Sequence, residues 1–238
     1  MIVFVDYEHA SARTTEWGRE VTRLRTEITY RLEDLAGEHC MLVRYDRLTD
    51  ELLDRLEPTS IVISGNGSIP DRYTDDELAP ARRLIRSRRF PMFGLCGGFQ
   101  LMATTLGSEL VPLGDLSDEE VDAADADRSP FTSATVTEVG YAPVELSEEH
   151  PLLEGLGVAP VFRHAHMFQV DVLPDGFRRL ASSALTGIQM AVDDEHRMAG
   201  TQFHPESWTD EFPDGRRLLS NFFDWVRDGP GDPGRRPG

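Results

Sequence analysis

The first 106 residues alternate short apolar runs with longer amphipathic segments, and this alternation limits the folds open to the chain. The apolar runs are short enough for buried strands, and the longer segments carry apolar residues at helical spacing. Strands and helices that alternate in this way favour parallel β-α-β units with helices on both faces of the sheet. We expect strands at residues 2–5, 40–43 and 60–63, and helices at 14–35, 49–56, 75–88 and 99–106.

The sequence F-G-L-C-G-G-F-Q at residues 93–100 follows an apolar approach at 90–92 and precedes the helix expected at 99–106. Glycines at 94, 97 and 98 supply the backbone freedom that a tight strand-to-helix turn needs. The pattern Gly-x-Cys-x-Gly is the thiol version of a nucleophile elbow, and a helix N-terminus favours thiolate over thiol. Cys96 is therefore a candidate nucleophile. A lone cysteine in an apolar run is equally an inert core residue, so a base elsewhere must decide.

The second half changes character. Residues 113–130 are crowded with Asp and Glu and predict a solvated loop, with a metal site as a weak alternative because no calcium-loop spacing is present. From residue 131 onward, short β-type runs separated by Pro and Gly predict antiparallel strands that complete and flank the parallel sheet. A last helix is expected at 212–227. We therefore predict one α/β domain over residues 1–228 and a disordered Pro/Gly tail over 229–238.

Composition excludes several classes of function. The formal charge of −18 argues against sequence-independent nucleic-acid binding, which needs basic patches. The chain contains no lysine, so Schiff-base and P-loop lysine chemistry are excluded. No apolar run reaches bilayer-spanning length and no signal-type leader is apparent, which favours a cytoplasmic protein without a membrane contact. Cys40 and Cys96 form no disulfide framework or metal knuckle, and Cys40 is expected in the core.

A candidate base lies in the sequence G-T-Q-F-H-P-E at residues 200–206, which follows an apolar run. Pro205 pushes His204 into an extended conformation, where residues two apart point to the same side. His204 and Glu206 can therefore reach one place together. A Cys nucleophile, a His base and a carboxylate that orients the ring form the general nucleophile triad. We predict the triad Cys96, His204 and Glu206.

The pairing of G-L-C-G-G-F-Q-L-M-A with G-T-Q-F-H-P-E resembles the class I, triad-type glutamine amidotransferases, over roughly residues 1–228. The resemblance implies a flavodoxin-like fold, with a mostly parallel sheet and added antiparallel strands. It also implies that Cys96 attacks the side-chain amide of L-glutamine to form a γ-glutamyl thioester, with His204 as acid and base and Glu206 as its orienter. No cofactor or metal is implied.

Further site residues follow from the same resemblance. The oxyanion hole would comprise Gly97 and the loop Gly65, Asn66 and Gly67, which the residues alone also allow to be an ordinary turn. Asn66 and Gly67 replace a commoner Gly-Pro pair. Gln100 would help to hold substrate, and Ala165 and His166 fall in the segment through which family members contact the glutamine backbone. Ala165 replaces the usual serine.

Three functions remain open. The first is a glutaminase that supplies ammonia to a separate synthase, a partner expected because the chain carries no nucleotide-binding loop for an acceptor reaction. The second is a free-standing hydrolase of γ-glutamyl amides or peptides. The third, a non-catalytic regulatory subunit, is disfavoured because all three triad residues are present. A homodimer is compatible with the sequence, but no sequence feature supports one.

Overall fold

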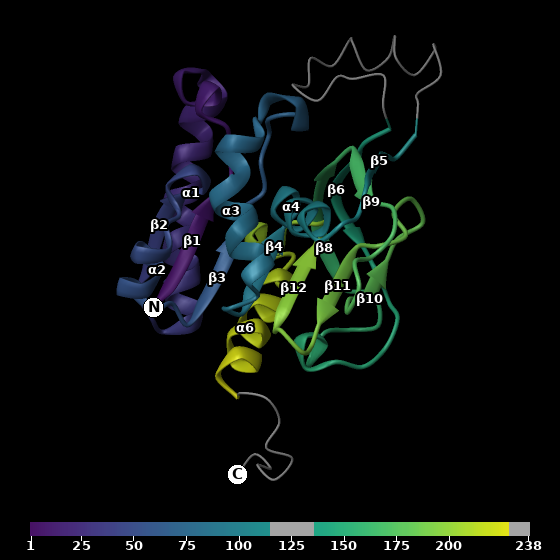
Figure 1. Ribbon diagram of the computed structural model, residues 1–238. Coiled ribbons are helices and arrows are strands. Elements are labelled where there is room, and N and C mark those ends of the chain that lie inside the picture. Colours follow the sequence, from purple (N-terminus) through teal and green to yellow (C-terminus); the bar gives the residue numbers. More distant parts are fainter. Residues whose placement is uncertain (115–135, 229–238) are drawn as a thin grey trace.

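The computed structural model describes residues 1–114 and 136–228. An eight-stranded sheet in the order β2-β1-β3-β4-β12-β11-β10-β7 forms the centre of the molecule (Figure 1). Strands β2, β1, β3, β4 and β12 are parallel, and β11, β10 and β7 continue the sheet antiparallel. The sheet strands are β1 Ile2–Asp6, β2 Cys40–Arg44, β3 Ser60–Ile63, β4 Met92–Leu95, β7 Glu145–Leu146, β10 Arg178–Ser182, β11 Met190–Asp193 and β12 Met198–Thr201.

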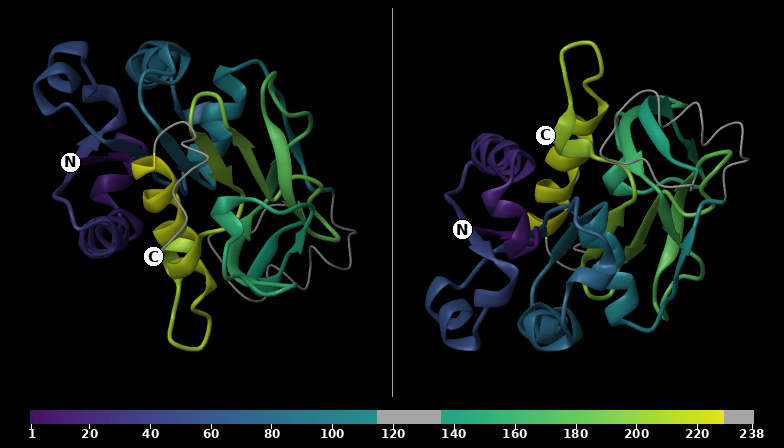
Figure 2. Two further views of the ribbon diagram at one scale, coloured as in Figure 1. Left: turned by 90° about the horizontal axis from the view of Figure 1, so that it is seen from below. Right: turned by 90° about the horizontal axis from the view of Figure 1, so that it is seen from above.

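Helices cover both faces of this sheet, as Figure 2 shows in views along it. Helices α1 Glu16–Ala36 and α6 Asp214–Arg227 share one apolar core with the sheet, and α2 Asp50–Leu56 and α3 Asp75–Ser87 pack against the other face. Helix α4 Gly97–Thr105 follows β4 directly and packs beside α3. The predicted α/β fold with a mostly parallel sheet is confirmed.

Two small antiparallel pairs stand beside the sheet. Strand β5 Leu110–Pro112 pairs with β9 Phe168–Val170, and β6 Glu138–Pro143 pairs with β8 Val161–His166. An isolated bridge joins Arg163 of β8 to His204, so the second pair is fixed to the main sheet next to β12. Short 3-10 turns occupy Ala10–Thr14, Tyr45–Arg47, Pro70–Arg72, Pro151–Leu153 and Pro205–Ser207.

Helix ends follow the expected capping chemistry. The Thr15 side chain accepts a hydrogen bond from the Gly18 amide at the start of α1, and Gly37 ends the helix at a φ of 67°. Thr74 and Glu77 form a reciprocal capping box at the start of α3, so the helix begins at Asp75 although Pro80 lies inside it. These caps fix where α1 begins and ends and where α3 begins.

Several boundaries differ from the sequence-based expectation. The apolar approach at residues 90–92 is short enough for a buried strand, but the strand before the elbow is β4 at Met92–Leu95. Strand β10 was not predicted, and β12 pairs parallel with β4, not antiparallel. Residues 115–130 of the acidic segment and the tail at 229–238 lie outside the described residues. Within the described parts of the chain, no helix is long and apolar enough to cross a membrane.

Candidate active site

Cys96 lies in the turn between β4 and α4. Its backbone has φ 47° and ψ −106°, a conformation that side-chain-bearing residues rarely adopt. The Cys96 amide donates to the carbonyl of Thr201 on the neighbouring strand at 2.7 Å, which anchors the turn to β12. Cys96 is only 5% exposed. The predicted strand-turn-helix elbow is therefore present, and it presents the sulfur at the carboxyl edge of the sheet.

Gly98 is an elbow residue that has no room for a side chain. A Cβ atom at Gly98 would lie 2.3 Å from the carbonyl oxygen of Ile63 in β3. We expect Gly98→Ala to lower the free energy of unfolding by about 1–3 kcal/mol, because helix α4 would have to move away from β3. Urea denaturation followed by tryptophan fluorescence measures this change. Gly187→Ala is the control, since nothing lies within 4 Å of its Cβ position; equal losses in the two variants would contradict the close-packing argument.

His204 and Glu206 reach Cys96 from the end of β12. The His204 amide donates to the carbonyl of Arg163 at 2.7 Å, and its ring Nδ1 lies 2.7 Å from Oε1 of Glu206. Glu206 is buried within the Pro205–Ser207 turn, and the side chains of His204 and Cys96 are close enough to interact electrostatically. The structure thus brings the three predicted triad residues together in the order nucleophile, imidazole and carboxylate.

The electrostatics of this group favour a charged imidazole. Burial of the His204 ring opposes protonation, but the carboxylate of Glu206 and the thiolate of Cys96 outweigh it, so the pKa of His204 lies well above its ordinary value. Thiolate and imidazolium together are the ionisation state in which a cysteine can attack an amide and a histidine can protonate the leaving nitrogen.

Gln202, which is not among the predicted site residues, also contacts the sulfur. It is fully buried, and its Nε2 donates to the Sγ of Cys96 at 3.5 Å. Its Oε1 accepts from Nε2 of Gln100 at 3.1 Å, and that same Gln100 nitrogen donates to the carbonyl of Phe168 at 3.1 Å. The amide nitrogen of Gln100 is therefore engaged within the protein, although the residue lines the cavity at Cys96. Gln202 precedes His204 by two residues, so the alternation that predicted Glu206 also indicated Gln202.

The loop at residues 65–67 lies against the elbow. A Cβ built on Gly97 would lie 3.1 Å from the amide nitrogen of Asn66, and one built on Gly65 would lie 3.5 Å from Cβ of Cys96. Asn66 and Gly97 are thus close enough to direct their amides into one space beside the sulfur. The Gly67 amide instead donates to the Glu8 carboxylate at 2.7 Å, so this predicted donor is engaged elsewhere.

Ala165 and His166 lie on β8, on the other side of Cys96. The carbonyl oxygen of Ala165 is 4.0 Å from Sγ, so this backbone faces the nucleophile. The His166 ring is directed elsewhere: its Nδ1 is 3.1 Å from the carbonyl of Phe168, and its Nε2 is 3.0 Å from Oε2 of Glu138. Of this segment, the backbone of Ala165 is the part best placed to meet a substrate.

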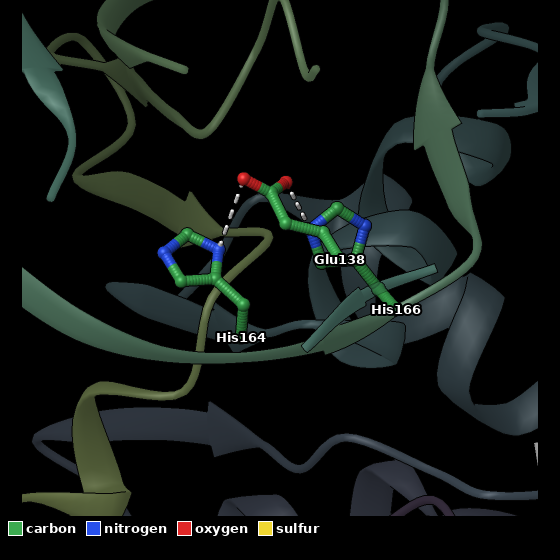
Figure 3. Close-up of side chains that lie close together, drawn as sticks. All are labelled: Glu138, His164 and His166. Atoms are coloured by element: carbon green, nitrogen blue, oxygen red, sulfur yellow. Dashed lines mark ion pairs between the residues drawn. The ribbon is translucent and has the colours of Figure 1, made fainter. Parts of the chain in front are cut away.

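The carboxylate of Glu138, on β6, lies between the rings of His164 and His166, which are on β8 (Figure 3). Burial opposes its ionisation, but hydrogen bonds from His166, Thr186 and Ser183 and the nearby His164 lower the pKa of Glu138 to about 2. Its carboxylate also accepts from Nε2 of Gln189 at 2.7 Å.

The ligand-type atoms of Glu138, His164 and His166 lie within 4.8 Å of one another, which is a spacing that a metal ion could bridge. The carboxylate oxygens, however, already accept from Ser183 at 2.9 Å, from Thr186 at 2.8 Å and from Gln189. An ion would have to displace these donors, and it would lie against the positive end of the Gln189 amide group. The cluster is better explained as a hydrogen-bonded support for β8.

Two cavities meet at the triad. The Cys96 cavity, of about 240 Å³, is lined by Cys96, Gly97, Gln100 and residues 165–168. The His204 cavity, of about 300 Å³, is lined by His204, Glu206, Arg163 and both apolar and charged residues of α1. Asn66, Gly67 and Ala165 line both cavities and separate them. The nucleophile therefore faces one space, and its acid-base partner faces the other.

A comparison with family models matches residues 25–225 to the class I glutamine amidotransferases. The chain belongs to this family. The amidotransferase is 30% identical over 220 residues to the glutamine-hydrolysing GMP synthase of Phenylobacterium zucineum, and 31% identical over 216 residues to that of Ruthia magnifica. These alignments cover 91% and 89% of the chain but only 36% and 35% of the relatives. The chain thus spans about a third of the length of the curated relatives it matches.

Solved structures support the same fold. A Thermoplasma acidophilum chain, provisionally assigned as one of the subunits of a GMP synthase, superposes with a TM-score of 0.68 at 22% identity, covering 96% of the amidotransferase and 94% of that chain. The glutaminase domain of Trypanosoma brucei CTPS with bound acivicin superposes with a TM-score of 0.63 at 17% identity, covering 96% and 94%. The fold of the amidotransferase is therefore that of other class I glutamine amidotransferases.

Proposed function

We propose that the amidotransferase hydrolyses the side-chain amide of L-glutamine and that the ammonia serves a separate synthase. The observation that carries this proposal is the Cys96, His204 and Glu206 arrangement, in which Cys96 lines a cavity of about 240 Å³ that Ala165 also lines. The cavity is of a size for one small polar substrate. Because the relatives with the matching sequence are named as GMP synthases, an acceptor reaction of that kind is the one we propose first.

In the proposed reaction, the thiolate of Cys96 attacks the amide carbon, and the carbonyl oxygen becomes an oxyanion. The amides of Asn66 and Gly97 donate to that oxygen. As the C–N bond breaks, the His204 imidazolium gives its proton to the leaving nitrogen, which departs as ammonia. Water then loses a proton to neutral His204 and attacks the γ-glutamyl thioester, releasing glutamate and regenerating the Cys96 thiolate beside the imidazolium. Glu206 holds the ring in the tautomer that both steps need.

Glutamine hydrolysis and covalent labelling of Cys96 test this function together. Incubation of the purified chain with L-glutamine should yield glutamate and ammonia in equal amounts. A glutamine-mimicking electrophile should modify the peptide that carries Cys96, as read by mass spectrometry. Cys40 serves as an internal control, because burial and the nearby charge of Glu33 raise the pKa of the Cys40 thiol to about 12 and keep it protonated. If a folded chain leaves Cys96 unmodified, the proposal fails.

The second cavity favours one alternative function. His204 would protonate the leaving group, and it faces about 300 Å³ of space, which is more than ammonia requires. A free-standing hydrolase of γ-glutamyl amides would place the amine portion of its substrate there. The ratio of kcat/KM for γ-glutamyl methylamide to that for glutamine separates the two functions: a ratio above one favours the hydrolase, and a ratio well below one favours the glutaminase.

A further inference from the structure

We propose that Glu8, a residue outside both sequence motifs, is a positioning residue that fixes the oxyanion loop of residues 65–67. The proposal rests on the proposed glutamine hydrolysis. Glu8 is only 2% exposed and lies on the segment between β1 and α1. A buried carboxylate is costly unless donors satisfy it, so the identity of its donors indicates what it holds in place.

Two of those donors come from the loop and the residue that follows it. The Gly67 amide donates to Oε2 of Glu8 at 2.7 Å, and the hydroxyl of Ser68 donates to Oε1 at 2.5 Å. The indole Nε1 of Trp17 donates to Oε2 at 3.3 Å. Charge-assisted bonds of this kind are about twice as strong as neutral ones. Glu8 therefore holds the far end of the loop through two consecutive residues.

Trp17 closes the same end from the other side. A Cβ atom at Gly67 would lie 2.6 Å from Nε1 of Trp17, so the indole lies directly against the Gly67 backbone. A side chain at residue 67 would collide with this ring. Glycine has no ring to restrict its φ, in contrast to proline, so the backbone at residue 67 needs external bonds to adopt one conformation. The Glu8 carboxylate supplies such a bond.

The near end of the loop is held by Arg25 of α1. Its Nη2 donates to the carbonyl oxygen of Gly65 at 2.6 Å, and its Nε donates to Oδ1 of Asp6 at 2.9 Å. In a planar trans peptide, the C=O and the following N–H point in opposite directions. Fixing the Gly65 oxygen toward Arg25 therefore turns the Asn66 amide away from Arg25, to the side where Gly97 lies.

The contacts of Arg25 and Glu8 with the loop belong to one hydrogen-bond network. Oδ1 of Asp6, which accepts from Arg25, also accepts from the Glu8 amide at 3.1 Å. Arg25 thus sets the direction of the Asn66 amide, and Glu8 prevents residue 67 from rotating it away. Glu8 does not touch the sulfur or the substrate space directly. Its effect on the reaction is exerted through the Asn66 amide, which donates only when the oxyanion forms.

The test compares Glu8→Ala with Glu8→Gln in the full chain. In Glu8→Ala we expect kcat for glutamine hydrolysis to fall about 10- to 100-fold with KM within about threefold, because the loss falls on the transition state. Glu8→Gln should recover part of kcat, since its amide oxygen can accept from Gly67 and Trp17 and its nitrogen can donate to the Ser68 hydroxyl, whereas the bond from the His9 amide to Oε1 is lost. Glu20→Gln, on the exposed face of α1, is the control and should match the wild type.

Alkylation of Cys96 by iodoacetamide distinguishes positioning from a general structural role. This reaction displaces iodide from a saturated carbon and forms no oxyanion, so its rate should be unchanged in Glu8→Ala. Parallel losses of alkylation and hydrolysis would overturn the proposal, as would a wild-type kcat in Glu8→Ala. A wild-type chain that alkylates at Cys96 but does not hydrolyse glutamine would count against the proposed function alone. In that case, hydrogen exchange of the Gly67 amide tests whether Glu8 holds the loop. The amide should be protected from exchange in the wild type, and this protection should be lost in Glu8→Ala.

Discussion

Replacing Cys96 with alanine should lower glutamine hydrolysis by about 10⁴-fold or more while leaving the protein folded. Sγ is the group that would bond to the amide carbon, and removal of a covalent nucleophile is among the most damaging changes an enzyme can suffer. Cys40, the other cysteine, cannot replace it, because it lies on β2 at the edge of the sheet, three strands away from β4. Release of glutamate, measured at saturating glutamine, gives the size of the loss.

The fold should survive this change. Alanine and cysteine both carry a Cβ atom, so the two are equally strained in the backbone conformation of residue 96. We expect the free energy of unfolding of Cys96→Ala to lie within about 1 kcal/mol of the wild type. Cys96→Gly should be as inactive but more stable than Cys96→Ala by about 1 kcal/mol, since glycine adopts φ 47° without strain. Hydrolysis that persists in a folded Cys96→Ala protein would contradict the assignment of the nucleophile.

The first half of the fold could be predicted from the sequence because β1, β3 and β4 are short, almost entirely buried apolar runs and the helices have one apolar face. Strand β3 was predicted to the residue, at Ser60–Ile63, and α2 and α3 within one residue at each end. In these helices, the apolar residues recur every three or four positions, and this spacing can be seen in the sequence itself. The strand before Cys96 was predicted too early in the sequence, because Phe90-Pro91-Met92 is as apolar as β4 itself.

The second half was predicted less completely than the first, for physical reasons. Strand β10 has the sequence R-R-L-A-S, and its register with β11 shifts at a bulge between Arg179 and Ala181. Strand β6 contains Gly140 and ends at Pro143, two residues that normally indicate a turn. Both strands exist because partners distant in the sequence pair with them, and no local pattern reports those partners.

The active-site residues also divide into those that local sequence spacing predicts and those that are placed by contacts distant in the sequence. The sequence spacing predicted that His204 and Glu206 point together, and Gln202 was open to the same reasoning. Glu8 was not, because its contact with Gly67 joins residues 59 positions apart, and the motif that contains Gly67 gives no sign of a carboxylate at its side. Which loop donors face the nucleophile is decided by such distant contacts, here from Glu8 and Arg25.

Glu206→Gln is the second change expected to have a large effect, and its effect should depend on pH. The carboxylate both orients the His204 ring and raises the pKa of His204, whereas glutamine at this position keeps the shape but removes the charge. We expect kcat to fall about 10²- to 10⁴-fold at neutral pH. The alkaline limb of the pH profile should also move to lower pH, because the imidazolium that protonates the leaving nitrogen is lost earlier.

The matched control is Asp194→Asn, which removes the carboxylate that lies 2.9 Å from the ring of His150 and leaves the active site intact. Its hydrolysis profile should keep the wild-type alkaline limb. An unchanged limb in Glu206→Gln would exclude the carboxylate as the cause of the raised pKa.

The same linkage applies to stability. A raised His204 pKa stabilises the folded state fully below the unfolded value of about 6.5 and loses that contribution as the pH rises through the folded value. The wild-type free energy of unfolding should therefore decline between neutral and alkaline pH. Glu206→Gln should be less stable at neutral pH and decline less over that range, because its His204 is held less strongly in the charged form. Urea denaturation at several pH values measures both slopes, and equal slopes would show that the Glu206 charge does not act on His204.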